Sequence, residues 1–350
     1  MATTQHHLTL SRRWLTGGII GAVLIPWSVS EARPVHEQLT VDPQGSIEIV
    51  DVAGSVALSG WDRPEIEVTG TAGDQVDRVE LTTSGGRSVV RVIPRSGAAH
   101  GGGNETRLTV HVPTKSAVTV TLVSADLSLG TLQGSVKLRT VSGEVTGDVG
   151  GDFRASTVSG SVRVTAAAAR MIEVKTVSGT IHVSGSGGEV EISTISGDAT
   201  LDLVSITRGR FKSISGGLTA GFALAADGRF EGESVSGNLE VTFAGTPVAD
   251  FDVQSVSGNI RNCFGPKPKE AQYGPGSRLM FKSGEGSAHV QIETKSGNVS
   301  LCTKDSQPNK DAQVKRSADA ATASSCGRSP TLYEAGETAH GDRLRRFPLI

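Results

Sequence analysis

Three carboxylates in the second half of the chain have a spacing that suits acid–base chemistry. Glu231 and Glu233 alternate along one segment, and Asp252 stands at the position of Glu231 one repeat later. Two carboxylates on one face can act as acid and base in polysaccharide cleavage or hold a divalent cation. The competing interpretation is a solvated charged face, which we favour because Phe230 and Phe251 fall on the inward alternation and leave no aromatic platform outside.

A ladder of hydroxyl groups forms a second candidate site. Its first members are Thr140, Ser142, Thr157, Ser159, Thr176, Ser178, Thr194 and Ser196. A flat, regular hydroxyl array can bind ordered water or a repetitive polymer such as a polysaccharide. Ser and Thr also hydrogen-bond local backbone groups at turns. We prefer this structural role, because the second column is Ser throughout and the first changes to Ser at Ser213.

Other chemistry-bearing residues form no recognisable site. No two histidines stand four residues apart, and the sequence contains no Cys-x-x-Cys, no phosphate-binding Gly loop before a helix and no nucleophile elbow. We therefore predict a non-enzymatic protein with no catalytic residues, no metal and no cofactor.

Two of the three cysteines share a register. Cys263 and Cys302 each stand five residues after the glycine of a Ser-Gly pair, and Cys326 lies further on. If the intervening segment adds a full coil, the pair is about 9.6 Å apart, too far for a disulfide, whereas adjacent coils bring it within range. The sequence leaves both arrangements open.

A repeat carries all of these residues. Eight motifs run from Thr140-Val-Ser-Gly143 to Thr294-Lys-Ser-Gly297, with glycine spacings of 17 to 21 residues and a final gap of 39. A fixed period near 20 residues is typical of solenoids. Apolar residues alternate within each repeat, which indicates two short strands joined at Ser-Gly. We predict an all-β β-helix or β-solenoid of about 18–21 residues per coil, preceded by a β-rich N-terminal cap region.

Two columns of the repeat indicate which side chains face inward and which face water. In the first seven motifs the residue after the Thr or Ser is β-branched, and we interpret this column as core: Val141, Val158, Val177, Ile195, Ile214, Val235 and Val256. The residue three before the motif is polar and is expected to face water: Lys137, Arg154, Glu173, Glu191, Arg210, Glu231, Asp252 and Gln291.

The flanking segments indicate export. Arg12 and Arg13 precede an apolar run that is too short to span a bilayer and ends in small residues, the layout of a signal peptide cleaved after Ala32. We predict a protein without a transmembrane anchor that is periplasmic, at the cell surface or secreted. The predicted organisation is a signal peptide at 1–32, a β-rich region continuous with the solenoid at 33–123, β-helix repeats at 124–303 and a disordered polar tail at 304–350.

Composition restricts the function further. The 350 residues include 44 glycines, are 4% aromatic and carry a formal net charge of −2. The glycine excess disfavours a helical enzyme, and the balanced charge gives no field that would attract nucleic acid.

Several motifs resemble a known family. They are Gly54-Ser-Val-Ala-Leu-Ser-Gly-Trp-Asp62, Val110-His-Val-Pro113, Val123-Ser-Ala-Asp126, the Thr-Val-Ser-Gly ladder and Phe264-Gly-Pro-Lys267. Together they resemble the bacterial putative-adhesin family of exported β-strand-repeat proteins, a domain of unknown function similar to the toastrack domains of envelope-stress systems. The resemblance covers residues 40–302; it implies a β-helical fold outside the cytoplasm and supplies no catalytic residues.

These observations favour an adhesin, or an envelope-associated binding or scaffold protein, whose partner is an unidentified surface glycan or envelope protein. One alternative is a component of an envelope-stress sensor. Another is a polysaccharide-active β-helix enzyme that uses Glu231, Glu233 and Asp252. The ligand, the handedness of the helix and the oligomeric state stay open at this level.

Overall fold

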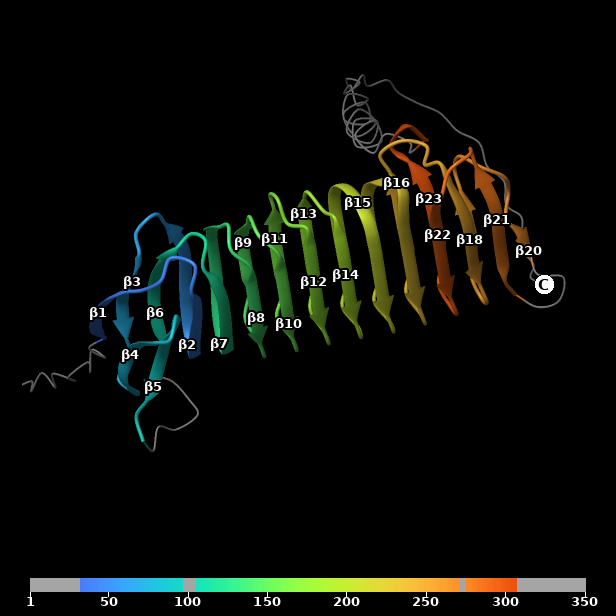
Figure 1. Cartoon of the computed structure of the whole chain (residues 1–350). Helices are drawn as coiled ribbons and strands as arrows, with labels where there is room; N and C mark the ends of the chain where they lie inside the picture. Colours follow the sequence, from blue (N-terminus) through green and yellow to red (C-terminus); the bar gives the residue numbers. More distant parts are fainter. Residues whose placement is uncertain (1–31, 97–104, 271–274, 307–350) are drawn as a thin grey trace, which may run out of the picture.

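The protein is a rod of stacked β-coils (Figure 1). A computed structural model describes residues 32–96, 105–270 and 275–306. Within these ranges the regular elements are 23 hydrogen-bonded strands and one 3-10 helix at Lys304–Ser306. The prediction of an all-β solenoid is therefore confirmed, whereas the predicted signal peptide and most of the predicted tail lie outside the described residues.

Each central coil contributes one strand to each of two parallel ladders. The Thr-ended ladder precedes the Ser-Gly turn and contains β8 (Val136–Thr140), β10 (Phe153–Thr157), β12 (Met171–Thr176) and β14 (Glu189–Thr194). The post-glycine ladder contains β9 (Val145–Val149), β11 (Val162–Ala166), β13 (Ile181–Gly185) and β17 (Leu239–Phe243). Two longer strands, β15 (Ala199–Ser213) and β16 (Leu218–Ser234), pass round a corner and belong to both ladders.

The core lies between the two ladders and is built by strand alternation. In β8 the side chains of Val136, Leu138 and Thr140 are buried, while Lys137 and Arg139 face solvent. The motif Thr therefore points inward, and the next residue, Val141, is 48% exposed. The same holds for the other members of the column that the sequence analysis interpreted as core, so that prediction is wrong. The charged column three residues before the motif faces outward, as expected.

The N-terminal region continues both ladders. Two long strands, β2 (Ser46–Trp61) and β7 (Ala117–Leu132), pair in parallel along most of their length. The first half of β2 then pairs with β5 (Arg87–Pro94), and its second half pairs with β6 (Thr106–Pro113). Antiparallel strands cover the outer edges: β4 (Val76–Ser84) on β5, β3 (Glu65–Ala72) on β6, and β1 (Arg33–Thr40) on β3.

The last coil of the chain is inserted between two earlier coils. In the Thr-ended ladder, β22 (Ala288–Thr294) lies between β16 and β18 (Ala249–Ser255). In the post-glycine ladder, β23 (Val299–Thr303) lies between β17 and β19 (Ile260–Asn262). The intervening residues include β21 (Ser277–Ser283), antiparallel to β18, and β20 (Lys269–Glu270) at the outer edge.

This insertion brings the two in-register cysteines together. Because β23 pairs directly with β19, Cys263 and Cys302 lie on neighbouring coils, and they form a disulfide with their Cα atoms 4.8 Å apart. Of the two arrangements that the sequence left open, the structure has the adjacent one.

Candidate functional site

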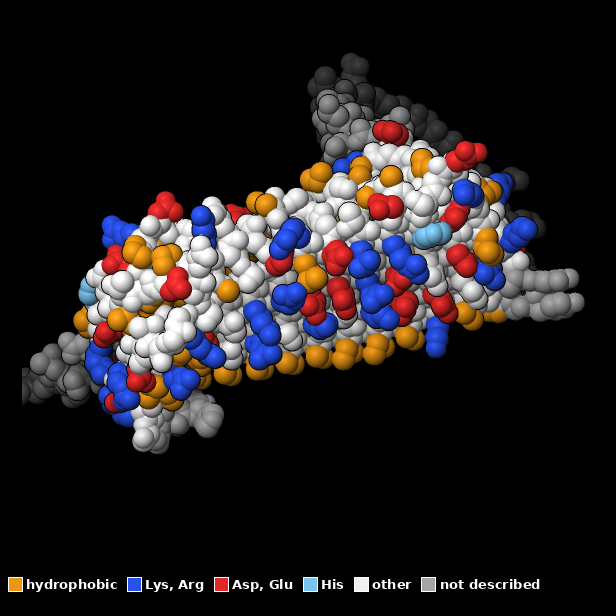
Figure 2. All heavy atoms as spheres, in the orientation of Figure 1, with side chains coloured by type: hydrophobic (Ala, Val, Ile, Leu, Met, Phe, Trp, Pro, Cys, Tyr) orange, Lys and Arg blue, Asp and Glu red, His pale blue; other side chains and the backbone are white. Residues whose placement is uncertain are grey.

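An exposed line of aliphatic side chains follows one long edge of the rod (Figure 2). We call it the aliphatic row, and each of its seven consecutive members is 40–52% exposed. They are Val123, Val141, Val158, Val177, Ile195, Ile214 and Val235. In the order of the stack, Lys295 of the inserted coil occupies the next position, and Val256 follows it.

The Thr-x-Ser-Gly turn forces the row residue outward. The buried hydroxyl of Thr157 accepts a hydrogen bond from the Gly160 amide at 2.9 Å, and Thr194 accepts one from Gly197 at 2.8 Å. This hydrogen bond connects the first and last residues of the turn and leaves the side chain of the row residue, which follows the Thr, on the outside. Gly197 is required because a Cβ there would lie 2.0 Å from the carbonyl oxygen of Gly179 in the preceding coil.

Backbone hydrogen bonds continue through the corner and hold the row straight. The Ser159 amide donates to the Val141 carbonyl, and the Ser196 amide to the Val177 carbonyl, both at 2.9 Å. Successive row residues are therefore held at the strand spacing of about 4.8 Å. Val and Ile have few χ1 rotamers, so the row is rigid before any partner arrives.

The predicted hydroxyl ladder divides into an inner and an outer column. Thr140, Thr157, Thr176 and Thr194 are buried, so this half of the ladder is not a binding surface. The outer column is Ser142, Ser159, Ser178 and Ser196, none of which is buried. Several of its hydroxyls donate to the row carbonyl of the preceding coil, for example Ser159 to Val141 at 3.3 Å. Local backbone bonding is thus the role that the structure gives these hydroxyls.

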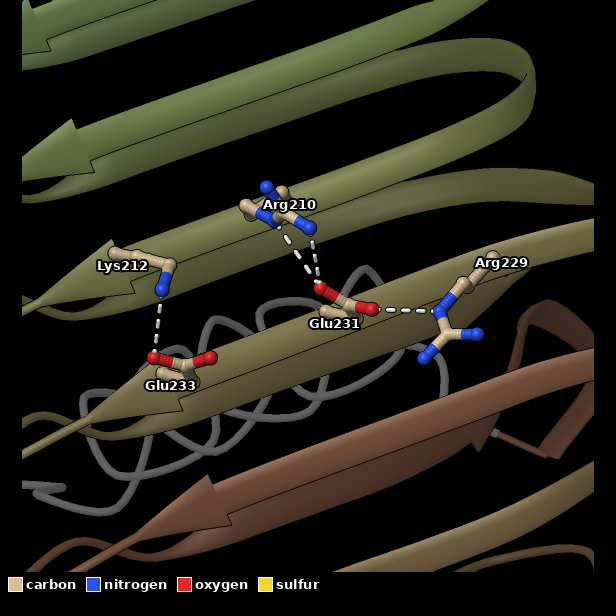
Figure 3. A network of polar contacts seen from close by, with 5 residues as sticks. All are labelled: Arg210, Lys212, Arg229, Glu231 and Glu233. Atoms are coloured by element: carbon tan, nitrogen blue, oxygen red, sulfur yellow. Dashed lines mark hydrogen bonds and ion pairs between the residues drawn. The ribbon is translucent and has the colours of Figure 1, made fainter.

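The predicted acidic cluster is a set of ion pairs (Figure 3). Glu231 accepts hydrogen bonds from Arg210 at 2.9 Å and Arg229 at 2.6 Å, and Glu233 pairs with Lys212 at 3.0 Å. Burial acts to raise the pKa of Glu231, but its hydrogen bonds with the two arginines outweigh burial and hold that pKa below its usual range. Glu231 is therefore a poor proton donor at neutral pH.

Asp252 is not a neighbour of these two carboxylates. The inserted strand β22 places Gln291 between Glu231 and Asp252, and Asp252 pairs instead with Arg278 at 3.2 Å. The expectation that all three lie close together is wrong for Asp252, because the chain order does not give the stacking order here. In the part of the chain that the structure describes, no group of three His, Cys, Asp or Glu residues is placed to hold a metal.

The aliphatic row escaped the sequence analysis, although one signal for it was present. The repeat column that contains Val141 and Val235 also contains Lys295. A lysine is almost never fully buried without a partner, so a column that accepts it at one coil is a surface column at every coil. The alternation through Leu138 and Thr140 points to the same conclusion.

The architecture defines the chain as a parallel β-solenoid with a rigid apolar edge. Residues 46–302 match the model of the Toastrack DUF4097 family, and the chain belongs to that family. The resemblance predicted for residues 40–302 is thereby confirmed over residues 46–302. Within the described ranges, no helix has the length and apolarity needed to cross a membrane.

The solved structures that match the chain are distant from it in sequence. A protein described as a putative adhesin from Parabacteroides distasonis is 16% identical, with 78% of this chain and 98% of that chain covered and a TM-score of 0.43. A protein from the same species described as a putative lipid binding protein is 12% identical, with 77% and 98% covered and a TM-score of 0.45. A putative adhesin from Parabacteroides merdae is 12% identical, with 77% and 96% covered and a TM-score of 0.37. No curated protein matches the chain.

Proposed function

We propose that this chain is an exported, non-enzymatic binding or scaffold protein of the bacterial envelope that recognises its partner through the aliphatic row. The observation that carries the proposal is the row itself: seven β-branched side chains about half exposed in an unbroken line. Scattered exposed apolar residues need no explanation, but a contiguous strip of them marks an interaction surface.

The chemistry of the row favours a protein partner over a glycan. A glycan is held by hydrogen bonds and by aromatic stacking, whereas the row residues are aliphatic and several of the neighbouring serines donate to backbone carbonyls of their own chain. The ion pairing of Glu231 and Glu233 also argues against acid–base cleavage of a polysaccharide.

Two features support a location outside the cytoplasm. One is the signal-peptide layout of residues 1–32. The other is the pairing of Cys263 with Cys302, since disulfides persist mainly in oxidising compartments.

The first test is protease treatment of intact cells that produce the chain, with fractionation as a control. Loss of the chain from unbroken cells places it at the surface, and protection until the envelope is opened places it in the periplasm. Recovery in the cytoplasmic fraction would contradict the proposal.

The same cells test the row. A variant with Val177→Asp and Ile195→Asp is expected to leave the envelope fraction and appear in the medium or the soluble periplasm. The matched control is Val204→Asp, because Val204 is 70% exposed but lies outside the row. Equal retention of both variants would show that the row does not bind the envelope partner.

A further inference from the structure

We propose that the aliphatic row pairs with the same row of a second copy of this chain, about a two-fold axis parallel to the solenoid axis. This inference rests on the proposed function, because it names the partner of the same surface. Such a contact is isologous, so each copy presents one patch to its equal.

The spacing of the row matches another solenoid of the same kind. The Ser178 amide donates to the Val158 carbonyl and the Ser215 amide to the Ile195 carbonyl, at 2.9 and 2.8 Å, so the row follows the strand spacing without insertion. That spacing is about 4.8 Å. An α-helix advances about 5.4 Å per turn, so its side chains fall out of register with the row by half a row spacing within roughly four turns. A second copy keeps register with the row along its whole length.

The surface beside the row can receive the row of a partner. A short serine follows every row residue, so the side chains next to the row are smaller than those of the row itself. The hydroxyls of Ser159 and Ser196 already donate to backbone carbonyls of their own chain at 3.3 Å, so covering them leaves no donor unpaired. In the proposed dimer the row of each copy lies over the serine column of the other, and the side chains interdigitate as they do in a dry steric zipper.

The charges on the two flanks of the row select the orientation. At the six levels from Val123 to Ile214, the residues two before the row include three cations and no acid, and the residues three after it include three acids and no cation; at the seventh level, Val235, the residue two before is the acid Glu233. The cationic flank is Arg139, Lys175 and Lys212, and the acidic flank is Asp126, Glu144 and Asp198, all exposed.

A two-fold axis parallel to the rod sets the cationic flank of one copy against the acidic flank of the other. An axis perpendicular to the rod sets cations against cations. Some of these charges also have partners in their own chain: Lys175 pairs with Glu173, and Lys212 with Glu233. The flanks therefore fix the orientation more than they add affinity.

The narrowness of the contact makes it reversible. A strip one side chain wide offers on the order of several hundred Å² per copy, whereas standard interfaces begin at roughly 1,200 Å² counted over both partners, or about 600 Å² per copy. We expect a dissociation constant between about 10 µM and 1 mM. Copies concentrated at one envelope reach that range.

Sedimentation equilibrium of the full chain from about 5 µM to 1 mM tests the proposal. The wild type is expected to show a reversible monomer–dimer equilibrium. Val177→Asp with Ile195→Asp should raise the dissociation constant at least tenfold, whereas Val204→Asp should leave it unchanged. Lys295→Val makes the row continuous from Val235 to Val256 and should lower the dissociation constant about three- to tenfold. Thermal unfolding of each variant verifies that the fold is intact.

Cross-linking tests the orientation. In a Cys326→Ser background, Val141→Cys is expected to give a disulfide-linked dimer, because the parallel two-fold axis brings residue 141 next to its equivalent. In the antiparallel arrangement about Val177, residue 141 would face Ile214. A cross-link that forms only when both Val141→Cys and Ile214→Cys are present would overturn the proposed axis.

The outcomes separate this inference from the proposed function. In one outcome the wild type stays monomeric at 1 mM, but the variant with Val177→Asp and Ile195→Asp still leaves the envelope fraction. This result overturns the dimer and keeps the row as a binding site for another partner. A second outcome also overturns the dimer: the wild type stays monomeric and binds 3:1 phosphatidylcholine–phosphatidylglycerol vesicles, whereas the variant does not bind them. That result assigns the row to a lipid surface. A variant that changes neither readout overturns both proposals.

Discussion

The Thr106 hydroxyl and the Asp51 carboxyl hydrogen-bond to each other inside the N-terminal coils, where the two residues are 3% and 1% exposed. The Val52 amide donates to the other carboxyl oxygen at 2.7 Å, and the Thr106 hydroxyl also lies 3.0 Å from the Ala53 carbonyl. A hydroxyl has one proton. Thr106 therefore shares its single proton between the Asp51 carboxyl and the Ala53 carbonyl.

The pH dependence of stability should reveal this buried acid. Burial raises the pKa of Asp51 above 3.8 despite its hydrogen bonds with Thr106, Val52 and Ala53. The folded state therefore holds a proton that the unfolded state releases, so the contribution of Asp51 is complete below pH 3.8 and is lost as pH rises through the raised pKa.

We expect Asp51→Asn to remove this loss, because the amide is neutral at every pH and keeps an oxygen that can accept a hydrogen bond. The unfolding free energy of the variant relative to wild type should grow by about 1.4 kcal/mol per pH unit between the pKa of Asp51 in the unfolded state and its raised pKa in the folded state, and then level off. Urea unfolding from pH 4 to 8 measures this, with the exposed Asp62→Asn as the control. Parallel pH curves for wild type and Asp51→Asn would refute the assignment.

The inner hydroxyl column offers a matched pair for measuring the turn hydrogen bond. Thr157→Val removes the acceptor of the buried Gly160 amide and should cost about 1–3 kcal/mol of unfolding free energy. The hydroxyl of Thr176 is buried without a hydrogen-bond partner among the described residues. Thr176→Val should therefore be neutral or stabilise by up to about 1 kcal/mol. Equal losses at both positions in urea titrations would contradict the role given to the Thr157 hydroxyl.

Much of the fold can be predicted from the sequence, because seven Ser-Gly turns at nearly constant spacing suit a solenoid and few other architectures. The facing of the Val141 column is a different case. A uniform β-branched column suits a core and a rigid corner equally well, and only the alternation through Leu138 and Thr140, together with Lys295, separates the two. The local sequence therefore contains the information that the column is exposed, but the more conspicuous β-branched pattern predicts a buried one.

The inserted coil has no local signal. Strands β18 and β22 show the same inward alternation, so their pattern does not tell which of them pairs with β16. The choice between them depends on the whole path of the chain after Ser255. Two features of the sequence are consistent with the inserted coil: the gap of 39 residues between the last two motif glycines, and the matched register of Cys263 and Cys302.

The close stacking of motif glycines gives a test of the solenoid itself. Gly197→Ala places a methyl group 2.0 Å from the Gly179 carbonyl oxygen, a backbone atom that cannot move without opening the ladder. We expect a loss of about 1–3 kcal/mol or more. The control is Gly245→Ala, which meets nothing within 4 Å. Chemical denaturation of both variants measures the difference, and an unperturbed Gly197→Ala would mean that the coils are not stacked at this corner.

The disulfide should stabilise the inserted coil most of all. It closes a segment of 39 residues that connects β19 to β23, and a loop of that length corresponds to about 4 kcal/mol in the chain-entropy account, with 2–4 kcal/mol typical of measured bridges. Cys263→Ser with Cys302→Ser should lower the unfolding free energy by that amount and raise hydrogen exchange in β22 and β23 first. Cys326→Ser is the matched control, and iodoacetamide should label only Cys326 in the unreduced, unfolded chain. Labelling of all three cysteines would show that the bridge does not form, and the last coil would then have to hold its place by strand pairing alone.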